Sequence, residues 1–371
     1  MICKLFIPLT IRYEKDLLLV AVAALIVFSC KKETKEVISD PPDSRAPSVN
    51  GNYTICNEDN WANDGDIQDF ESDLVAVYNN KSYFFHNNAQ LSPTDSRRNK
   101  IRIYDGTNWE VKSSGIPFDP TYIGFAFVIG NKGYFGYTTY VGSSSHGDTW
   151  QYNFTTNAWS STEDFPDYYL SNPAYFTVNN KGYVVGGIKG SFNSYYTWEF
   201  DPSASPKWKK KANLPGVGRL SSVGFTIDTK GYVAAGITSL PYPYADVYHK
   251  ALFQYNPSND TWAIKADFPG EGRESAKAFA TNGKGYVGGG YTRDGNDFNY
   301  FYDFYQYNPY TNNWSRVDNY GTGGQLRECF SINSKGYAVW KPNSDVFFDP
   351  LKLKKYTPSV CTTIPGGPTV P

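Results

Sequence analysis

Three arginines are spaced so that a repeating fold would bring them to one anionic ligand. Arg219, Arg273 and Arg327 follow one another at intervals of 54 residues. A guanidinium group can bind a carboxylate or a sulfate through two parallel hydrogen bonds. We therefore expect an anion-binding arc. The structural alternative is that these arginines bond the carbonyls of neighbouring repeats, or pair with Glu274 and Glu328.

Tyrosines are the second group of candidate binding residues. The chain contains 31 of them, and several fall in segments that connect the apolar runs. A flat ring with a hydroxyl group suits stacking on a sugar, or anchoring a protein partner at a low cost in entropy. We select Tyr195, Tyr244 and Tyr291 as candidate ligand-binding residues. The alternative is that they only pack within their own loops.

Residues that usually carry metal or acid–base chemistry are few. The only histidines are His86, His146 and His249, in three different predicted repeats, whereas metal sites need clustered ligands. Glu274 and Glu328 could transfer protons, but neutralising the neighbouring arginines explains them as well. We predict no metal, no cofactor and no catalytic residue.

Composition limits the classes of fold and partner. The chain has 35 basic and 36 acidic residues, so it lacks the broad positive field that binding to nucleic acid requires. Aromatic residues make up 17% of the sequence, with 33 glycines and one methionine. This balance favours strands and turns over helical bundles, which predicts an all-β protein.

The N-terminal segment has the pattern of an export signal. Basic residues precede an uncharged apolar run at 17–28, which is short for a membrane span of about 20 residues. The segment that ends in Ser29 and Cys30 resembles a bacterial lipoprotein cleavage box. That resemblance implies that residues 1–29 are removed and that Cys30 is lipidated; ordinary secretion or a retained anchor is the alternative.

The mature chain is then expected at the bacterial cell envelope, at the outer membrane or the cell surface. Residues 30–50 are charged and rich in proline, which predicts a flexible tether. The membrane would be contacted only through the lipid.

A repeat of about 50 residues determines the predicted architecture. The tripeptide Lys-Gly-Tyr recurs with its tyrosines at intervals of 49, 49, 54 and 51 residues, and a tryptophan recurs in step at intervals of 50, 49, 54 and 52. The tyrosines are Tyr134, Tyr183, Tyr232, Tyr286 and Tyr337, and the tryptophans are Trp109, Trp159, Trp208, Trp262 and Trp314. Two markers that share one period make a chance repeat improbable.

Each repeat can be divided into four strands. An apolar segment such as 223–227 suits a buried inner strand, and a tight turn leads to the second strand, which begins with the motif tyrosine. A glycine pair follows, where backbones can approach closely. The third strand ends in Tyr-Asn-Pro, and the fourth carries the tryptophan, which we expect to pack between repeats.

These motifs, in this order, resemble the kelch family over residues 70–357. The resemblance implies a β-propeller of six four-stranded blades. In the last repeat Tyr356 stands where a tryptophan is expected, and seven blades are the alternative if residues 53–61 begin another. The predicted domains are the signal peptide at 1–29, the tether at 30–50, the propeller at 51–357 and a tail rich in proline and glycine at 358–371.

The strand polarity of such a blade places two sets of connections on opposite faces. The loops between strands two and three are long, at 138–148, 188–196, 237–249 and 291–300. Long loops on a rigid scaffold are where binding residues tend to lie. We expect the functional site on that face.

Closure of a ring also makes its first and last blades neighbours. Cys56 and Cys361 flank the repeats, so we expect a disulfide between them, with frayed ends and free thiols as the alternative. Cys329 lies in an apolar strand pattern and is expected in the core.

Two functions remain open from the sequence. The first is a cell-surface binding module whose long-loop face takes a glycan, an acidic small molecule or a protein. The second is a metal-independent carbohydrate-active enzyme such as a sugar epimerase or mutarotase, which some bacterial kelch propellers resemble. The fold alone does not decide between them.

Overall fold

The described part of the chain forms one compact unit within Tyr53–Ile364. The computed structural model describes residues 53–56, 60–67, 74–86, 99–118, 123–141, 144–167, 170–189, 191–240, 245–295, 297–321, 323–342, 351–359 and 361–364. The predicted signal peptide, Cys30, the tether and Tyr244 lie outside these residues. No helix among the described residues is long and apolar enough to cross a membrane.

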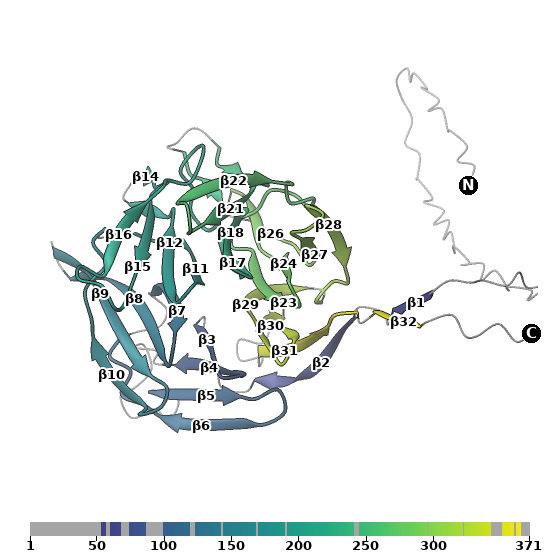
Figure 1. Cartoon of the computed structure of the whole chain (residues 1–371), viewed down its shortest axis with the longest axis horizontal. Coiled ribbons are helices and arrows are strands. Elements are labelled where there is room, and N and C mark those ends of the chain that lie inside the picture. The colour runs from purple at the N-terminus through teal and green to yellow at the C-terminus, as the bar shows by residue number, and fades with distance from the viewer. Residues whose placement is uncertain are drawn as a thin grey trace, which may run out of the picture. The chain divides into compact units, whose positions relative to one another are not determined.

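Six four-stranded antiparallel sheets form a six-bladed β-propeller (Figure 1). Blades I to III are, from the inner strand outward, β3 (Val75–Tyr78), β4 (Lys81–His86), β5 (Lys100–Tyr104) and β6 (Trp109–Ser113); β7 (Ile123–Ile129), β8 (Lys132–Val141), β9 (Ser144–Asn153) and β10 (Ala158–Ser161); and β11 (Ala174–Val178), β12 (Lys181–Val185), β15 (Thr197–Phe200) and β16 (Trp208–Lys211). The predicted all-β fold with six blades is confirmed.

Blades IV to VI complete the ring. They are β17 (Val223–Ile227), β18 (Lys230–Ala234), β21 (Leu252–Asn256) and β22 (Thr261–Lys265); β23 (Lys277–Thr281), β24 (Lys284–Gly288), β27 (Phe304–Asn308) and β28 (Asn313–Val317); and β29 (Gly324–Ile332), β30 (Lys335–Pro342), β31 (Leu351–Thr357) and β2 (Asn60–Ile67). The inner strands contact one another in the order β3, β7, β11, β17, β23, β29 and back to β3. This circuit shows that the ring closes.

The last blade takes its outermost strand from the other end of the chain. Strand β2 pairs with β31, and Trp61 stands opposite Tyr356, as Trp314 stands opposite Tyr307 in blade V. Trp61 is therefore the tryptophan of the sixth blade, and Tyr356 holds the strand-three tyrosine position instead of the tryptophan position predicted for it. The segment around Trp61 closes blade VI and does not begin a seventh blade.

Packing between blades explains the glycine of the Lys-Gly-Tyr motif. A Cβ atom on Gly231 would lie 2.0 Å from the ring of Phe176 in the preceding blade. Phe176 in turn stacks on Tyr183 of its own blade, with ring centroids 5.2 Å apart. The same contact recurs where Gly182, Gly285 and Gly336 meet Phe127, Phe225 and Phe279. The position has no room for a side chain.

The blade tryptophans pack between blades, as predicted. In blades II to V the indole N–H donates to a group in the connection that leads from the preceding blade. The bonds are Trp159 to Ser114 Oγ at 2.8 Å, Trp208 to Glu163 O at 3.2 Å, Trp262 to Ala212 O at 2.9 Å and Trp314 to Ala266 O at 2.8 Å. Each tryptophan thus ties its blade to its neighbour.

Three of the long loops carry short hairpins. These are β13 (Ile188–Lys189) with β14 (Phe192–Asn193), β19 (Ile237–Thr238) with β20 (Val247–Tyr248), and β25 (Tyr291–Asp294) with β26 (Asp297–Tyr300). They extend blades III, IV and V beyond strand two on the predicted functional face.

A separate two-stranded ladder joins the two ends of the unit. Strand β1 (Tyr53–Cys56) pairs antiparallel with β32 (Cys361–Ile364), and Cys56 is directly opposite Cys361. The register therefore brings the backbones of the two flanking cysteines together.

Candidate functional site

The inner strands begin around a cavity on the propeller axis, which we call the axial mouth. Its volume is about 320 Å³. It is lined from all six blades by Leu74, Gly124, 172–175, 221–224, 275–277 and 325–328. Connections between blades arrive at this end of the inner strands, so the mouth lies on the face that carries the long loops.

Backbone bends of an uncommon kind recur around the mouth. Asn172, Ser221 and Ser275 have φ angles of 52°, 52° and 56°, a left-handed conformation that few residues other than glycine adopt. The N–H of Ser221 donates to the carbonyl of Asn172 at 2.8 Å, and the N–H of Ser275 donates to the carbonyl of Ser221 at 2.9 Å. These bonds link blades III, IV and V and direct polar groups toward the axis. Strained backbone of this sort is concentrated at functional sites.

The charged side chains of the mouth come from blades V and VI. Lys277 Nζ lies 3.6 Å from Glu328 Oε2, and Arg327 also lines the cavity. Burial, and next the carboxylate of Glu328, raise the pKa of the Tyr175 hydroxyl, so that Tyr175 stays protonated at neutral pH. The mouth thus combines two cations, one carboxylate and one neutral phenol.

An apolar part of the channel continues below the mouth. This second cavity has a volume of about 360 Å³ and shares Tyr175 and Gly224 with the first. Gly224 is required there, because a Cβ atom would lie 2.2 Å from the carbonyl oxygen of Tyr175. The channel is therefore polar at its entrance and lined by valine, alanine and phenylalanine farther in.

Arg273, expected at the rim, belongs to the scaffold. Its side chain is fully buried, and its two terminal nitrogens bond both carboxylate oxygens of Asp303 at 2.5 and 3.1 Å. The same guanidinium donates to the carbonyls of Glu271 and Gly289 at 2.9 and 3.0 Å. These bonds match the structural alternative and leave no exposed group for a ligand.

Arg219 is buried in the equivalent place of blade IV but has no acidic partner there. The position that corresponds to Asp303 is Ala251, because Leu252 and Phe304 begin equivalent strands. Its Nε and Nη1 atoms are shielded from solvent and make no hydrogen bond, and the guanidinium lies 4.9 Å from the centre of the Phe253 ring. Burial lowers the pKa of Arg219 to about 10, so it remains charged at neutral pH.

Arg327 alone of the three arginines lines the mouth. Arg219 and Arg273 precede the inner-strand phenylalanine of their blades by six residues, whereas Arg327 precedes Phe330 by three, at a register shift in β29. The equal spacing of 54 residues in sequence therefore does not correspond to equal positions in the blades. The expected arc is corrected to one arginine at the mouth and two in the scaffold.

The candidate tyrosines of the loops lie away from the mouth. Tyr195 packs edge-on against Phe192, with ring centroids 5.8 Å apart. Tyr291 packs against Phe298 at 5.2 Å, and its hydroxyl accepts a hydrogen bond from Arg293 at 3.4 Å. Both are partly exposed on their hairpins and neither lines the axial cavity.

Sequence reasoning missed the residues that do line it, above all Tyr175, Ser221, Ser275 and Lys277. A usable signal exists, since the left-handed residue stands four positions before the inner-strand phenylalanine in blades III, IV and V. Recognising it requires the blades to be aligned on those phenylalanines.

Comparison with known proteins identifies the fold but not a family. No family model matches the chain, and no curated protein matches it. Among solved structures, one titled "Structure of YjhT" is similar with a TM-score of 0.58 and 16% sequence identity, over 76% of this chain and 92% of that chain. At that identity the likeness shows a shared fold.

Possible metal ligands are dispersed in the structure. Within the described ranges, no group of three or more histidine, cysteine, aspartate or glutamate side chains converges. His249 is half-buried, and its Nε2 lies 2.8 Å from Thr238 Oγ1, so this ring is held by a hydroxyl group.

Proposed function

We propose that this chain is a binding protein of the bacterial cell envelope that takes a small acidic ligand, such as an acidic sugar, at the axial mouth. The observation that carries the proposal is the convergence of all six blades on one polar cavity that contains Arg327 and Lys277. A volume near 320 Å³ lies at the small end of the range for ligand sites, which suits a ligand of monosaccharide size.

The order of motifs in the sequence supports a kelch-type propeller, and the N-terminal pattern supports anchoring through a lipid on Cys30. With residues 30–50 as a tether, the propeller would be held near the membrane without entering it. A protein partner on the long-loop face, around Tyr195 and Tyr291, is the other binding mode that we expected from the sequence.

Equilibrium binding of a panel of acidic and neutral sugars tests the proposal. We expect an acidic sugar to bind saturably and Arg327→Gln to weaken it by at least about tenfold, as for the loss of a charged hydrogen bond. Lys209→Gln makes the same change of charge at an exposed position on β16 and should leave binding unchanged. Equal binding by all three proteins would reject the mouth as the site.

A metal-independent sugar epimerase or mutarotase is the second candidate. It is favoured by Glu328 and Tyr175, which bring two groups able to exchange protons to the mouth. Following the anomers or epimers of each bound sugar by NMR distinguishes the candidates. Accelerated interconversion that is lost in Glu328→Gln would establish the enzyme, and binding without turnover would establish the binding protein.

A further inference from the structure

The seam between blades V and VI lacks a bond that the other blade interfaces have. In blades II to V the tryptophan N–H donates across the interface, but the N–H of Trp61 is shielded from solvent and has no hydrogen-bond partner. A cavity of about 650 Å³ lies beside it, lined by Trp61 and residues 316–319. The closing strand β2 therefore leaves space where its equivalents make contact.

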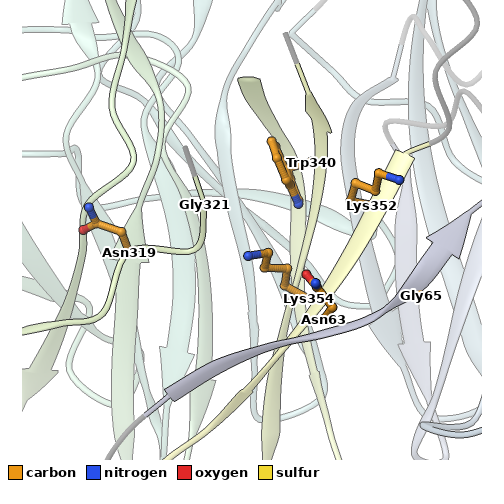
Figure 2. Close-up of a pocket in the computed structure, with 7 residues that line it drawn as sticks. All are labelled: Asn63, Gly65, Asn319, Gly321, Trp340, Lys352 and Lys354. Atoms are coloured by element: carbon orange, nitrogen blue, oxygen red, sulfur yellow. The ribbon is translucent and has the colours of Figure 1, made fainter. Parts of the chain in front are cut away.

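A second cavity adjoins the first, since both are lined by Asn319. Its volume is about 530 Å³, and its lining residues are Asn63, Gly65, Asn319, Gly321, Trp340, Lys352 and Lys354. Figure 2 shows Lys354 beside Asn63, with Trp340 close by and Asn319 on the other side of the pocket. We call the two cavities together the seam groove.

Trp340 offers the groove a second unused donor. Its N–H also lacks a hydrogen-bond partner while being shielded from solvent. The ring packs edge-on against Tyr320 with centroids 6.3 Å apart, and a Cβ atom on Gly321 would rest 3.5 Å from it in ordinary contact. The indole is thus held in position and has a polar atom to offer.

Lys354 gives the groove a positive charge without a carboxylate partner among the described residues. Its Nζ lies 5.9 Å from the centre of the Trp340 ring. The nearest candidate in sequence, Asp64, is already engaged, because one oxygen bonds Lys355 at 2.6 Å and the other accepts from Tyr104. Asp66 stands opposite Lys352 in the register of β2 and β31, so Lys354 is the better placed cation for an external anion.

The opening of the groove depends on one glycine. Gly65 lies at the register shift between Asn63 and Asp66, where its φ of 109° is one that a side chain would strain, and no atom lies within 4 Å of the place of a Cβ atom. The bulge turns β2 away from β31 there.

We propose that the seam groove is a second binding site, for an extended anionic glycan. Two unused indole donors and the amides of Asn63 and Asn319 can bond sugar hydroxyl groups, the Trp340 ring can cover an apolar sugar face, and Lys354 can bind a carboxylate. Two adjoining cavities suit several sugar units in a row, unlike the axial mouth. The site is independent of the ligand proposed there.

The probe for the test is a tetramer of galacturonic acid, and its fully methyl-esterified form is the uncharged control. We expect the acid to bind, the ester to bind poorly, and Lys354→Gln to weaken the acid about tenfold. Lys209→Gln and Arg327→Gln should bind the acid like the unmodified protein. A loss in Arg327→Gln with full binding in Lys354→Gln would overturn the seam site while supporting the mouth. Absence of acid binding would overturn the seam site alone.

An observation on the unmodified protein guards against effects of substitution on folding. The indole N–H resonances of Trp61 and Trp340 can be assigned in a spectrum of the ¹⁵N-tryptophan-labelled protein from Trp61→Phe and Trp340→Phe. Both resonances should shift during titration with the acid tetramer, and the resonance of Trp262, whose N–H is bonded to Ala212, should not. Constant positions for Trp61 and Trp340 would contradict the proposal even if the acid binds elsewhere.

Discussion

Two buried arginines in neighbouring blades differ in one partner. Arg273 has Asp303, and Arg219 has Ala251 in the corresponding place. A buried cation without a partner lowers stability, because neither water nor a carboxylate replaces the hydration that it loses on folding. The exposed fraction of the Arg219 side chain, 4%, makes this loss nearly complete.

Supplying the missing carboxylate should therefore stabilise the fold. We expect Ala251→Asp to raise the free energy of unfolding by roughly 1–3 kcal/mol, and Asp303→Ala in blade V to lower it by about 3 kcal/mol. Urea denaturation measures both changes. A lower midpoint for Ala251→Asp would show that Arg219 is already compensated by groups outside the described residues.

His249 should contribute a pH dependence to stability. Burial, and then the charge of Arg219, lower the pKa of His249 to about 4. The unfolded chain takes up this proton near pH 6.5, so between pH 6.5 and 4 the unfolded state binds more protons and stability falls as the pH falls. In His249→Gln the decrease over this window should be smaller. Unfolding free energies at pH 7.5 and 5 measure it, and equal decreases in both proteins would refute it.

At the scale of strands, the motif glycines set the distance between blades. Gly231→Ala would place a methyl group into the ring of Phe176, so we expect a loss of roughly 1–3 kcal/mol in unfolding free energy. Gly115→Ala is the matched control, because nothing lies within 4 Å of its Cβ position and its φ is not positive. If thermal denaturation lowered both midpoints equally, loss of glycine flexibility and not the blade contact would be responsible.

Motifs within one blade were predictable because they are local. Lys-Gly-Tyr, the glycine pair and the tryptophan each answer to a contact with a fixed place in the repeat, and their shared period was enough to predict six blades. The pairing of β2 with β31 was not predictable in this way, since it joins segments almost 300 residues apart and Trp61 stands outside the repeated order.

The candidate site was predictable only as a face. Loop lengths indicated the correct end of the blades, but equal intervals in sequence suggested that Arg327 is equivalent to Arg219 and Arg273. The blades themselves are not equally spaced, because the step from Tyr286 to Tyr337 is 51 residues. Burial of an arginine, and the absence of a carboxylate partner, appear only when neighbouring blades are packed.

For the whole molecule, the ladder of β1 and β32 makes a cross-link between the ends testable. Directly opposed residues of antiparallel strands have Cα atoms about 4.5–5.5 Å apart, within the range for a disulfide. We expect Cys56 and Cys361 to be oxidised by thiol–disulfide exchange with a disulfide oxidant of the exported compartment, which is reduced to its dithiol. The bridge would close a loop of about 300 residues and stabilise the fold by up to several kcal/mol.

Peptide mapping without reductant should find the Cys56–Cys361 linkage. Reduction, or Cys56→Ser, should lower the melting temperature, whereas reductant should not affect the Cys56→Ser protein further. Cys329 is a buried free thiol and should be alkylated only on unfolding. Rapid alkylation of Cys56 and Cys361 in the native protein isolated without reductant would rule the bridge out.

The origin of the closing strand has a mechanical consequence. Because β2 is the first strand of the propeller along the chain and the last needed to complete it, tension applied to the N-terminal side is carried into the seam before any other interface. A cross-link between β1 and β32 would stand ahead of that seam and divert the load into the C-terminal strand. An anchored propeller of this design would open first where its two ends meet, and one covalent bond would decide how much force it withstands.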